Sequence, residues 1–137
     1  MIIKKGAITN MNILRGQVSV DKYNFELVEG EPSLTTNVEV KINEVVPSDE
    51  ADKNILENGK IFRIEVPFAL ELDRFKIEGL ISQIAQIEEF FGQPNELEVD
   101  TMRELSKPLI DYIERLTYEV TEIAFDEPGV TLNFESN

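Results

Sequence analysis

The sequence contains no cysteine, no histidine and no tryptophan. Without cysteine the chain has no disulfide, no thiolate nucleophile and no cysteine-based metal site. Without histidine it lacks the commonest general base of enzymes and the commonest ligand of transition metals. Its serines and threonines therefore have no imidazole to activate them as nucleophiles, which counts against catalysis.

Long apolar runs are also missing. No segment approaches the ~20 apolar residues that a membrane-spanning helix needs. The N-terminal stretch MIIKKGAITNMNILRG has two lysines but lacks the apolar run of a secretory signal peptide. We therefore expect a cytoplasmic protein that does not insert into membranes.

Positive charge is scarce. The 137 residues include 13 Lys and Arg against 27 Asp and Glu, which gives a net charge of −14. Such a charge repels nucleic-acid backbones and anionic lipid surfaces, so we expect no nucleic-acid partner, whereas a basic protein partner would fit. The length and the apolar content of 42% predict a single domain over residues 1–137.

Segments of alternating apolar and polar residues predict the β-strands. They are residues 13–28, 35–46, 60–72 and 75–87. In the first segment the apolar phase changes by one residue near Asp21 and Lys22, which predicts a bulge or a turn. The second alternates most regularly, with Val38, Val40 and Ile42 expected to face the interior.

Prolines and polar clusters predict where these strands are interrupted. Pro67 lies within the third strand and cannot donate a ladder hydrogen bond, which predicts an edge position or a bulge. Asp73 and Arg74 are the expected two-residue turn between the last two strands. In the polar connection 47–58, we expect Ser48 to cap a short helical turn.

The last third of the chain changes to helical spacing. Thr101 and Glu104 fit a capping box with Thr101 as the N-cap residue. Pro108 disfavours helical geometry at Lys107, which predicts that this first helix ends or kinks there. From Pro108 to Ala124 the apolar residues recur at steps of three and four, which predicts a second helix of ~18 residues. Strands followed by helices indicate an α+β fold, a four-stranded antiparallel sheet with two C-terminal helices on one face.

An apolar tail follows the second helix. Pro128 and Gly129 stop the helix, and Val130, Leu132 and Phe134 then occupy alternate positions. These three side chains need cover. They either fold back along the domain or border a groove or a subunit contact, and the sequence leaves both alternatives open.

No motif for catalysis or for binding a cofactor stands out. The densest acidic cluster, residues 49–52, lacks the glycine and the closing glutamate of a calcium-binding loop. The glycines are isolated, so there is no phosphate-binding loop. We expect a protein that is not an enzyme, with no catalytic residue, no metal ligand and no cofactor.

Three stretches resemble a known family. They are RIEVPFALELDRFKIEGLISQI at 63–84, LSKPLIDYIERLTYEVTEIAFDEPGVTLNF at 105–134 and VSVDKYNFELVEG at 18–30. The first contains a Gly-(Leu/Val)-Ile-Ser-Gln signature. Together they resemble the domain of unknown function 1149 family, whose members are relatives of the export chaperone SecB. The resemblance implies a SecB-like fold that assembles into dimers or tetramers and binds unfolded polypeptide in hydrophobic grooves.

The resemblance also supplies candidate residues. We expect a chaperone or export adaptor with the polypeptide-binding candidates Ile55, Leu56, Phe125, Val130, Leu132 and Phe134. The outward acidic positions that would contact a partner are Glu26, Glu39, Glu65, Glu71 and Glu78. The alternative is a structural or regulatory oligomer that binds one specific basic partner without chaperone activity. A third, weaker hypothesis is a small-ligand pocket enclosed between the sheet and the helices.

Overall fold

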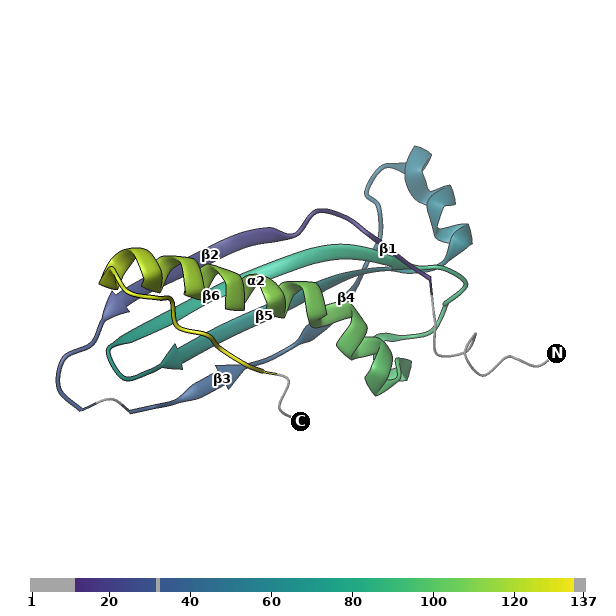
Figure 1. Cartoon of the computed structure of the whole chain (residues 1–137). Helices are drawn as coiled ribbons and strands as arrows, with labels where there is room; N and C mark the ends of the chain where they lie inside the picture. The colour runs from purple at the N-terminus through teal and green to yellow at the C-terminus, as the bar shows by residue number, and fades with distance from the viewer. Residues whose placement is uncertain (1–11, 32, 135–137) are drawn as a thin grey trace.

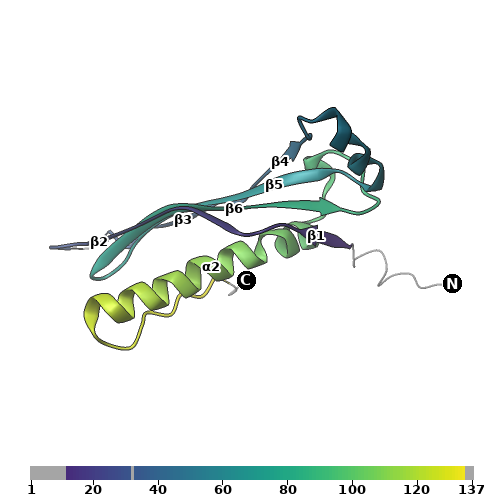
Figure 2. The same ribbon diagram turned by 90° about the horizontal axis from the view of Figure 1, so that it is seen from above.

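The computed structural model describes residues 12–31 and 33–134, which form one antiparallel sheet with a long α-helix across one face (Figures 1 and 2). The strands are β1 (Ile13–Arg15), β2 (Ser19–Leu27), β3 (Thr36–Val38), β4 (Lys41–Val45), β5 (Ile61–Glu71) and β6 (Phe75–Ile87). The helical elements are the 3-10 helices η1 (Glu50–Asn58) and η2 (Pro94–Glu96) and the α-helix α2 (Val99–Phe125). The α+β class and the antiparallel sheet are confirmed. The sheet has six strands rather than four, because two of the expected strands are interrupted.

The central pair of strands is the hairpin β5–β6. The two strands are joined at Asp73 and Arg74, where the Leu72 N–H donates to the Phe75 carbonyl at 2.8 Å, as expected from the sequence. Both β1 and β2 pair with β6, while both β3 and β4 pair with β5. The expected irregularity in the first strand is confirmed, since the register of β2 against β6 shifts between Val20 and Lys22.

The outer strand on the β5 side is interrupted opposite Pro67, which divides it into β3 and β4. The β3 and β4 strands pair with β5 in the same register, and between them the Glu39 N–H donates to the Pro67 carbonyl at 3.1 Å. Pro67 has no N–H to return this bond, so the ladder breaks there. Both alternatives expected for Pro67, an edge position or a bulge, are wrong: β5 has neighbours on both sides, and its register against β6 does not shift at Pro67. Val40, expected to face the interior, is instead exposed on the outermost strand.

The core lies between one face of the sheet and α2. Alternate residues of β5 and β6 are buried against the helix, as the strand periodicity predicts. The buried apolar side chains are Phe62, Ile64, Val66, Phe68, Leu70, Phe75, Ile77, Ile81, Ala85 and Ile87 from the hairpin, Leu97 after η2, and Leu105, Leu109 and Ile113 from α2. We call the opposite side of the sheet the open face. Figure 2 shows α2 on one side of the sheet and η1 on the other, at one end.

The helix caps differ from those expected. Asp49 rather than Ser48 caps η1, since its carboxylate accepts the Ala51 N–H at 3.1 Å. The α2 helix begins at Val99 with Glu98 as its N-cap residue, while Thr101 is buried inside the first turn. Within the described residues, none of the helices combines the length and the apolar character needed to cross a membrane.

Pro108 does not divide the C-terminal helix. The α2 helix runs without a break through Pro108, so the helical elements after the sheet are η2 and α2 rather than two α-helices separated at Lys107. Pro108 leaves the Glu104 carbonyl without its usual intrahelical donor. Arg15 of β1 supplies the replacement, donating from Nη2 to the Glu104 carbonyl at 2.5 Å and from Nη1 to the Leu105 carbonyl at 3.3 Å. Desolvation by burial lowers the pKa of Arg15.

Candidate functional site

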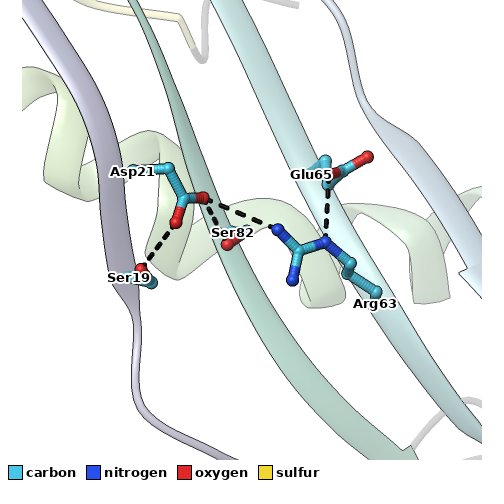
Figure 3. A network of polar contacts seen from close by, with 5 residues as sticks. All are labelled: Ser19, Asp21, Arg63, Glu65 and Ser82. Atoms are coloured by element: carbon cyan, nitrogen blue, oxygen red, sulfur yellow. Dashed lines mark hydrogen bonds and ion pairs between the residues drawn. The ribbon is translucent and has the colours of Figure 1, made fainter. Parts of the chain in front are cut away.

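A polar network occupies the middle of the open face (Figure 3). Asp21, at the bulge of β2, accepts hydrogen bonds from the Ser82 hydroxyl at 2.6 Å and the Ser19 hydroxyl at 2.8 Å. Arg63 lies 3.8 Å from the same carboxylate and donates from Nε to Glu65 at 3.0 Å. The hydrogen bonds from Ser82 and Ser19 hold the pKa of Asp21 below its ordinary value of 3.8. The network therefore fastens β2 to β6 at the irregular point of the sheet.

The Asp21→Asn variant is expected to lose about 1 kcal/mol of unfolding free energy at pH 7. The pKa of Asp21 is lower in the folded state than in the unfolded state. Ionised Asp21 therefore stabilises the fold at pH values above its ordinary pKa of 3.8. This contribution disappears as the pH falls through the lowered folded pKa. Urea titrations of both proteins between pH 7 and pH 3 measure the difference, which should shrink towards acid pH. A constant difference across this range contradicts the role of ionised Asp21.

All five acidic candidates lie on the open face, by the alternation of the strands and their register. Cations neutralise most of them. Glu26 pairs with Lys76 at 3.3 Å and Glu78 pairs with Lys22 at 3.6 Å. Glu65 is bound to Arg63. Glu71 accepts the Ser33 N–H at 3.2 Å, and the hydrogen bonds from Ser33 lower the pKa of its carboxyl group. Glu39 lies opposite Pro67 of β5. The open face thus carries interleaved charges of both signs rather than an acidic patch.

The apolar candidates lie in two separate places. Ile55 and Leu56 belong to η1, which lies over one end of the open face. The Gln86 side-chain amide fastens η1 there, donating to the Ile55 and Gly59 carbonyls, each at 2.9 Å. Ile55 is exposed and Leu56 is half-buried. The other four candidates lie at the end of α2 and in the tail, on the opposite side of the sheet (Figure 2). The structure therefore does not unite the six residues into one site.

The structure adds two apolar residues that sequence reasoning missed. Leu14 of β1 and Ile84 of β6 have exposed fractions of 45% and 39% and lie on the open face. Leu14 is paired with Gln86, whose side chain bonds the carbonyl of Ile55, and Ile55 has an exposed fraction of 41%. Gly16 lies beside Ile84 and has no side chain to cover it. We call Leu14, Ile55 and Ile84 the sheet-face patch. The sequence did contain a signal for Ile84. It is an apolar residue at a position of β6 whose alternation places it on the mostly polar face of the strand, away from the core.

The apolar tail folds back along α2, which is the first of the two alternatives that the sequence left open. Val130, Leu132 and Phe134 are half-buried against the core. The Val130 N–H donates to the Thr121 hydroxyl at 2.8 Å, and the Phe134 N–H donates to the Glu114 carboxylate at 3.3 Å. The tail is thus part of the cover of the domain.

Phe125 closes the end of the core at the helix C-terminus. Its ring lies 6.0 Å from those of Phe25 and Phe75, measured between centroids. The Arg74 guanidinium lies 3.8 Å from the centroid of the Phe125 ring, and Arg74 also pairs with Glu127 at 3.2 Å. Phe125 therefore anchors the helix to the β5–β6 turn.

Thr121→Val is expected to lower the unfolding free energy by about 1 kcal/mol and to loosen the tail. Valine keeps the shape of the side chain but removes the oxygen that accepts the Val130 N–H. Chemical unfolding measures the first effect, and faster amide hydrogen exchange at Val130 measures the second. Thr131→Val, at an exposed tail position, is the matched control and should change neither. Unchanged exchange at Val130 in Thr121→Val contradicts the anchoring role.

A groove of about 860 Å³ runs between α2 and the end of the tail. It is lined by Arg15, Arg103, Glu104, Ser106, Lys107, Pro108, Ile110, Asp111, Glu114 and Phe134. The groove is open to solvent and carries charges of both signs, so it differs from the enclosed apolar pocket that a small ligand would need. Within residues 12–31 and 33–134, acidic side chains form no group of three or more that could hold a metal ion.

Solved structures resemble this fold. A protein of unknown function from Streptococcus agalactiae shares 35% sequence identity and a TM-score of 0.77, covering 91% of this chain and 99% of its own. A SecB-like chaperone of Mycobacterium tuberculosis, in complex with a ChAD peptide from the HigA1 antitoxin, gives a TM-score of 0.53 at 17% identity. That match covers 90% of this chain and 88% of the chaperone chain. Among curated protein sequences, none matches.

The family model agrees with these structures and with the resemblance seen in the sequence. The model described as protein of unknown function (DUF1149) matches residues 11–134. This range spans all the strands and helices described above. The fold is SecB-like, and the chain belongs to the DUF1149 family.

Proposed function

We propose that this protein is a non-enzymatic polypeptide-binding protein, a chaperone or export adaptor that holds extended apolar segments of unfolded clients. The observation that carries this proposal is the sheet-face patch. Leu14, Ile55 and Ile84 come from three different elements and remain exposed on a sheet surface that α2 does not cover. Exposed apolar side chains gathered on one surface mark interaction sites for protein or ligand.

The geometry of the patch suits an extended chain. Strand positions on one face repeat every second residue, so an extended segment can place alternate side chains over the patch. The η1 helix lies over the same face and supplies Ile55, with half-buried Leu56 beside it. The SecB-like chaperone with a similar fold was solved with a bound peptide, which supports a polypeptide as the ligand.

The candidates on the helix side receive different roles. Phe125, Val130 and Leu132 are half-buried against the core, so we assign them to cover rather than to client contact. Phe134 borders the groove along α2, which makes it the tail residue best placed to touch a long client. The alternative of one specific basic partner has less support, because cations already pair with three of the five acidic candidates.

The test is an aggregation assay with a chemically denatured client enzyme. The wild-type protein should suppress light scattering at stoichiometric excess, and the double variant Leu14→Glu/Ile84→Glu should lose this effect, because buried charge on the patch opposes apolar contact. The matched control is Ile123→Glu on α2, which has a larger exposed fraction of 78% but lies away from the patch. Circular dichroism of each variant confirms folding. An absence of suppression by the wild-type protein rejects the proposal.

A further inference from the structure

We propose that Asn58, at the junction between η1 and β5, is a site of spontaneous deamidation and isoaspartate formation. Asn58 and Gly59 are the one Asn-Gly pair in the sequence. Asn58 is exposed at the last residue of η1, and the residue that follows it has no side chain to hinder attack on the amide. The inference concerns the chemistry of the chain itself, so it does not depend on the polypeptide-binding proposal.

The reaction uses two neighbouring residues and one water molecule, and nothing is oxidised or reduced. The backbone nitrogen of Gly59 loses its proton to solvent and attacks Cγ of Asn58, and the side-chain nitrogen takes up a proton and leaves as ammonia. Water then opens the cyclic imide. Cleavage of the new bond between the nitrogen and Cγ gives aspartate, whereas cleavage of the original peptide bond gives isoaspartate. In isoaspartate the backbone continues through Cβ and Cγ, and the former backbone carbonyl becomes a free carboxylate.

The fold restrains this reaction through a few bonds at the end of η1. The Gly59 N–H donates to the Leu56 carbonyl at 3.3 Å, which is long for such a bond, so the nitrogen is engaged while this turn is closed. The Gln86 side-chain amide holds the same turn through the Ile55 and Gly59 carbonyls. Since η1 has no buried residue, its last turn can open without unfolding the sheet. The rate of deamidation should therefore follow the population of the opened turn.

The junction has no room for a longer backbone. Gly59 is buried, and a Cβ atom there would lie 2.1 Å from the Ile87 carbonyl oxygen. The Asn58 carbonyl accepts the Glu89 N–H at 2.7 Å, and Glu89 has a φ of 64°, in the left-handed region that this bond helps to hold. Isoaspartate lengthens the chain and replaces this carbonyl, so it should separate η1 from the end of β6. Aspartate leaves the backbone unchanged and should keep these bonds.

Peptide mapping by mass spectrometry of the folded protein, incubated at mildly alkaline pH, tests the proposal. Asn58 should convert to aspartate and isoaspartate, while Asn54, exposed in the same helix but followed by β-branched Ile55, stays intact. Gln86→Met removes the donor that holds the turn and should raise the rate at Asn58 about fivefold. Lys76→Met, at an exposed position on the same face of β6, is the matched control and should leave the rate unchanged.

Two further measurements complete the test. The rate at Asn58 in denaturing urea should exceed that in the folded protein, which needs no variant to be folded. Hydrogen exchange should show that the Glu89 amide loses protection in the isoaspartate form but keeps it in Asn58→Asp, which has the charge without the longer backbone. An Asn58 as stable as Asn54 overturns the proposal, as do equal rates with and without urea. An unchanged rate in Gln86→Met, or full protection of the Glu89 amide in the isoaspartate form, overturns the role of the junction.

Discussion

Gly79→Ala is expected to lower the free energy of unfolding by about 3 kcal/mol. A Cβ atom at this position would lie 2.1 Å from the Lys22 carbonyl oxygen and 2.7 Å from Cζ of Phe68. The first contact is with backbone at the bulge of β2, which cannot rotate away as a side chain can. The methyl group must therefore push β2 away from β6 or displace Phe68 in the core. Urea unfolding of the variant measures the loss.

The neighbouring Glu78→Ala substitution is the control for Gly79→Ala. Glu78 is exposed, and within the described residues its one ion pair is with Lys22 at 3.6 Å, so its removal should cost less than about 0.5 kcal/mol. Hydrogen exchange should show that Gly79→Ala selectively exposes the amides of β2, while those of β5 stay protected. Equal stability of Gly79→Ala and the wild-type protein would show that β2 can shift without cost.

Arg15→Met is expected to lower the unfolding free energy by about 2 kcal/mol. The substitution keeps the apolar part of the side chain but removes the donor to the Glu104 and Leu105 carbonyls, and also the bond from Nη1 to Gln83 at 3.2 Å. The Glu104 carbonyl then has no donor from Pro108 and none from β1. Thermal and urea unfolding measure the effect. Arg103→Met is the control. In the part of the chain that the structure describes, the Arg103 side chain bonds the exposed Asp100, so its loss should lower the unfolding free energy by less than about 0.5 kcal/mol.

A double-mutant cycle with Pro108→Ala isolates the reason for this loss. Alanine at position 108 restores an N–H that can donate to the Glu104 carbonyl inside the helix. Arg15→Met should therefore cost about 1 kcal/mol less in the Pro108→Ala background than in the wild-type protein. Strict additivity of the two substitutions would show that Arg15 acts elsewhere than at the carbonyl left by the proline.

The Gly-Leu-Ile-Ser-Gln stretch of β6, residues 79–83, illustrates how a sequence motif can have a structural role. Gly79 allows the close approach of β2, and Ser82 donates to Asp21 at the bulge. Gln83 donates to the Gly16 carbonyl at 2.8 Å and accepts from Arg15. All three residues hold the irregular first strand against β6. The residues proposed to contact clients lie outside this stretch, and one of them, Ile84, directly follows it.

The local alternation of apolar and polar residues was sufficient to predict the hairpin at the centre of the sheet. The alternation from Phe62 to Leu70 and from Phe75 to Ile87 reports which side chains face α2, since a strand buried on one face repeats every two residues. The turn at Asp73 and Arg74 and the bulge near Asp21 were visible for the same reason, as short-range changes of phase or composition. The sequence showed that the apolar tail residues need cover, but it did not show which surface of the domain would cover them.

The sequence by itself therefore determined the α+β class, the central hairpin and the bulge, because each depends on neighbours within a few residues. It also determined the family, through three stretches spread along the chain. Tertiary structure decided the rest. The α2 helix continues past Pro108, and the carbonyl of Glu104 that the proline leaves without a donor is bonded by Arg15, 89 residues away. Pro67 occupies an interior strand. Three of the five acidic candidates on the open face pair with a lysine or an arginine, and two of these cations lie on a neighbouring strand. These outcomes depend on partners that only the folded chain brings together.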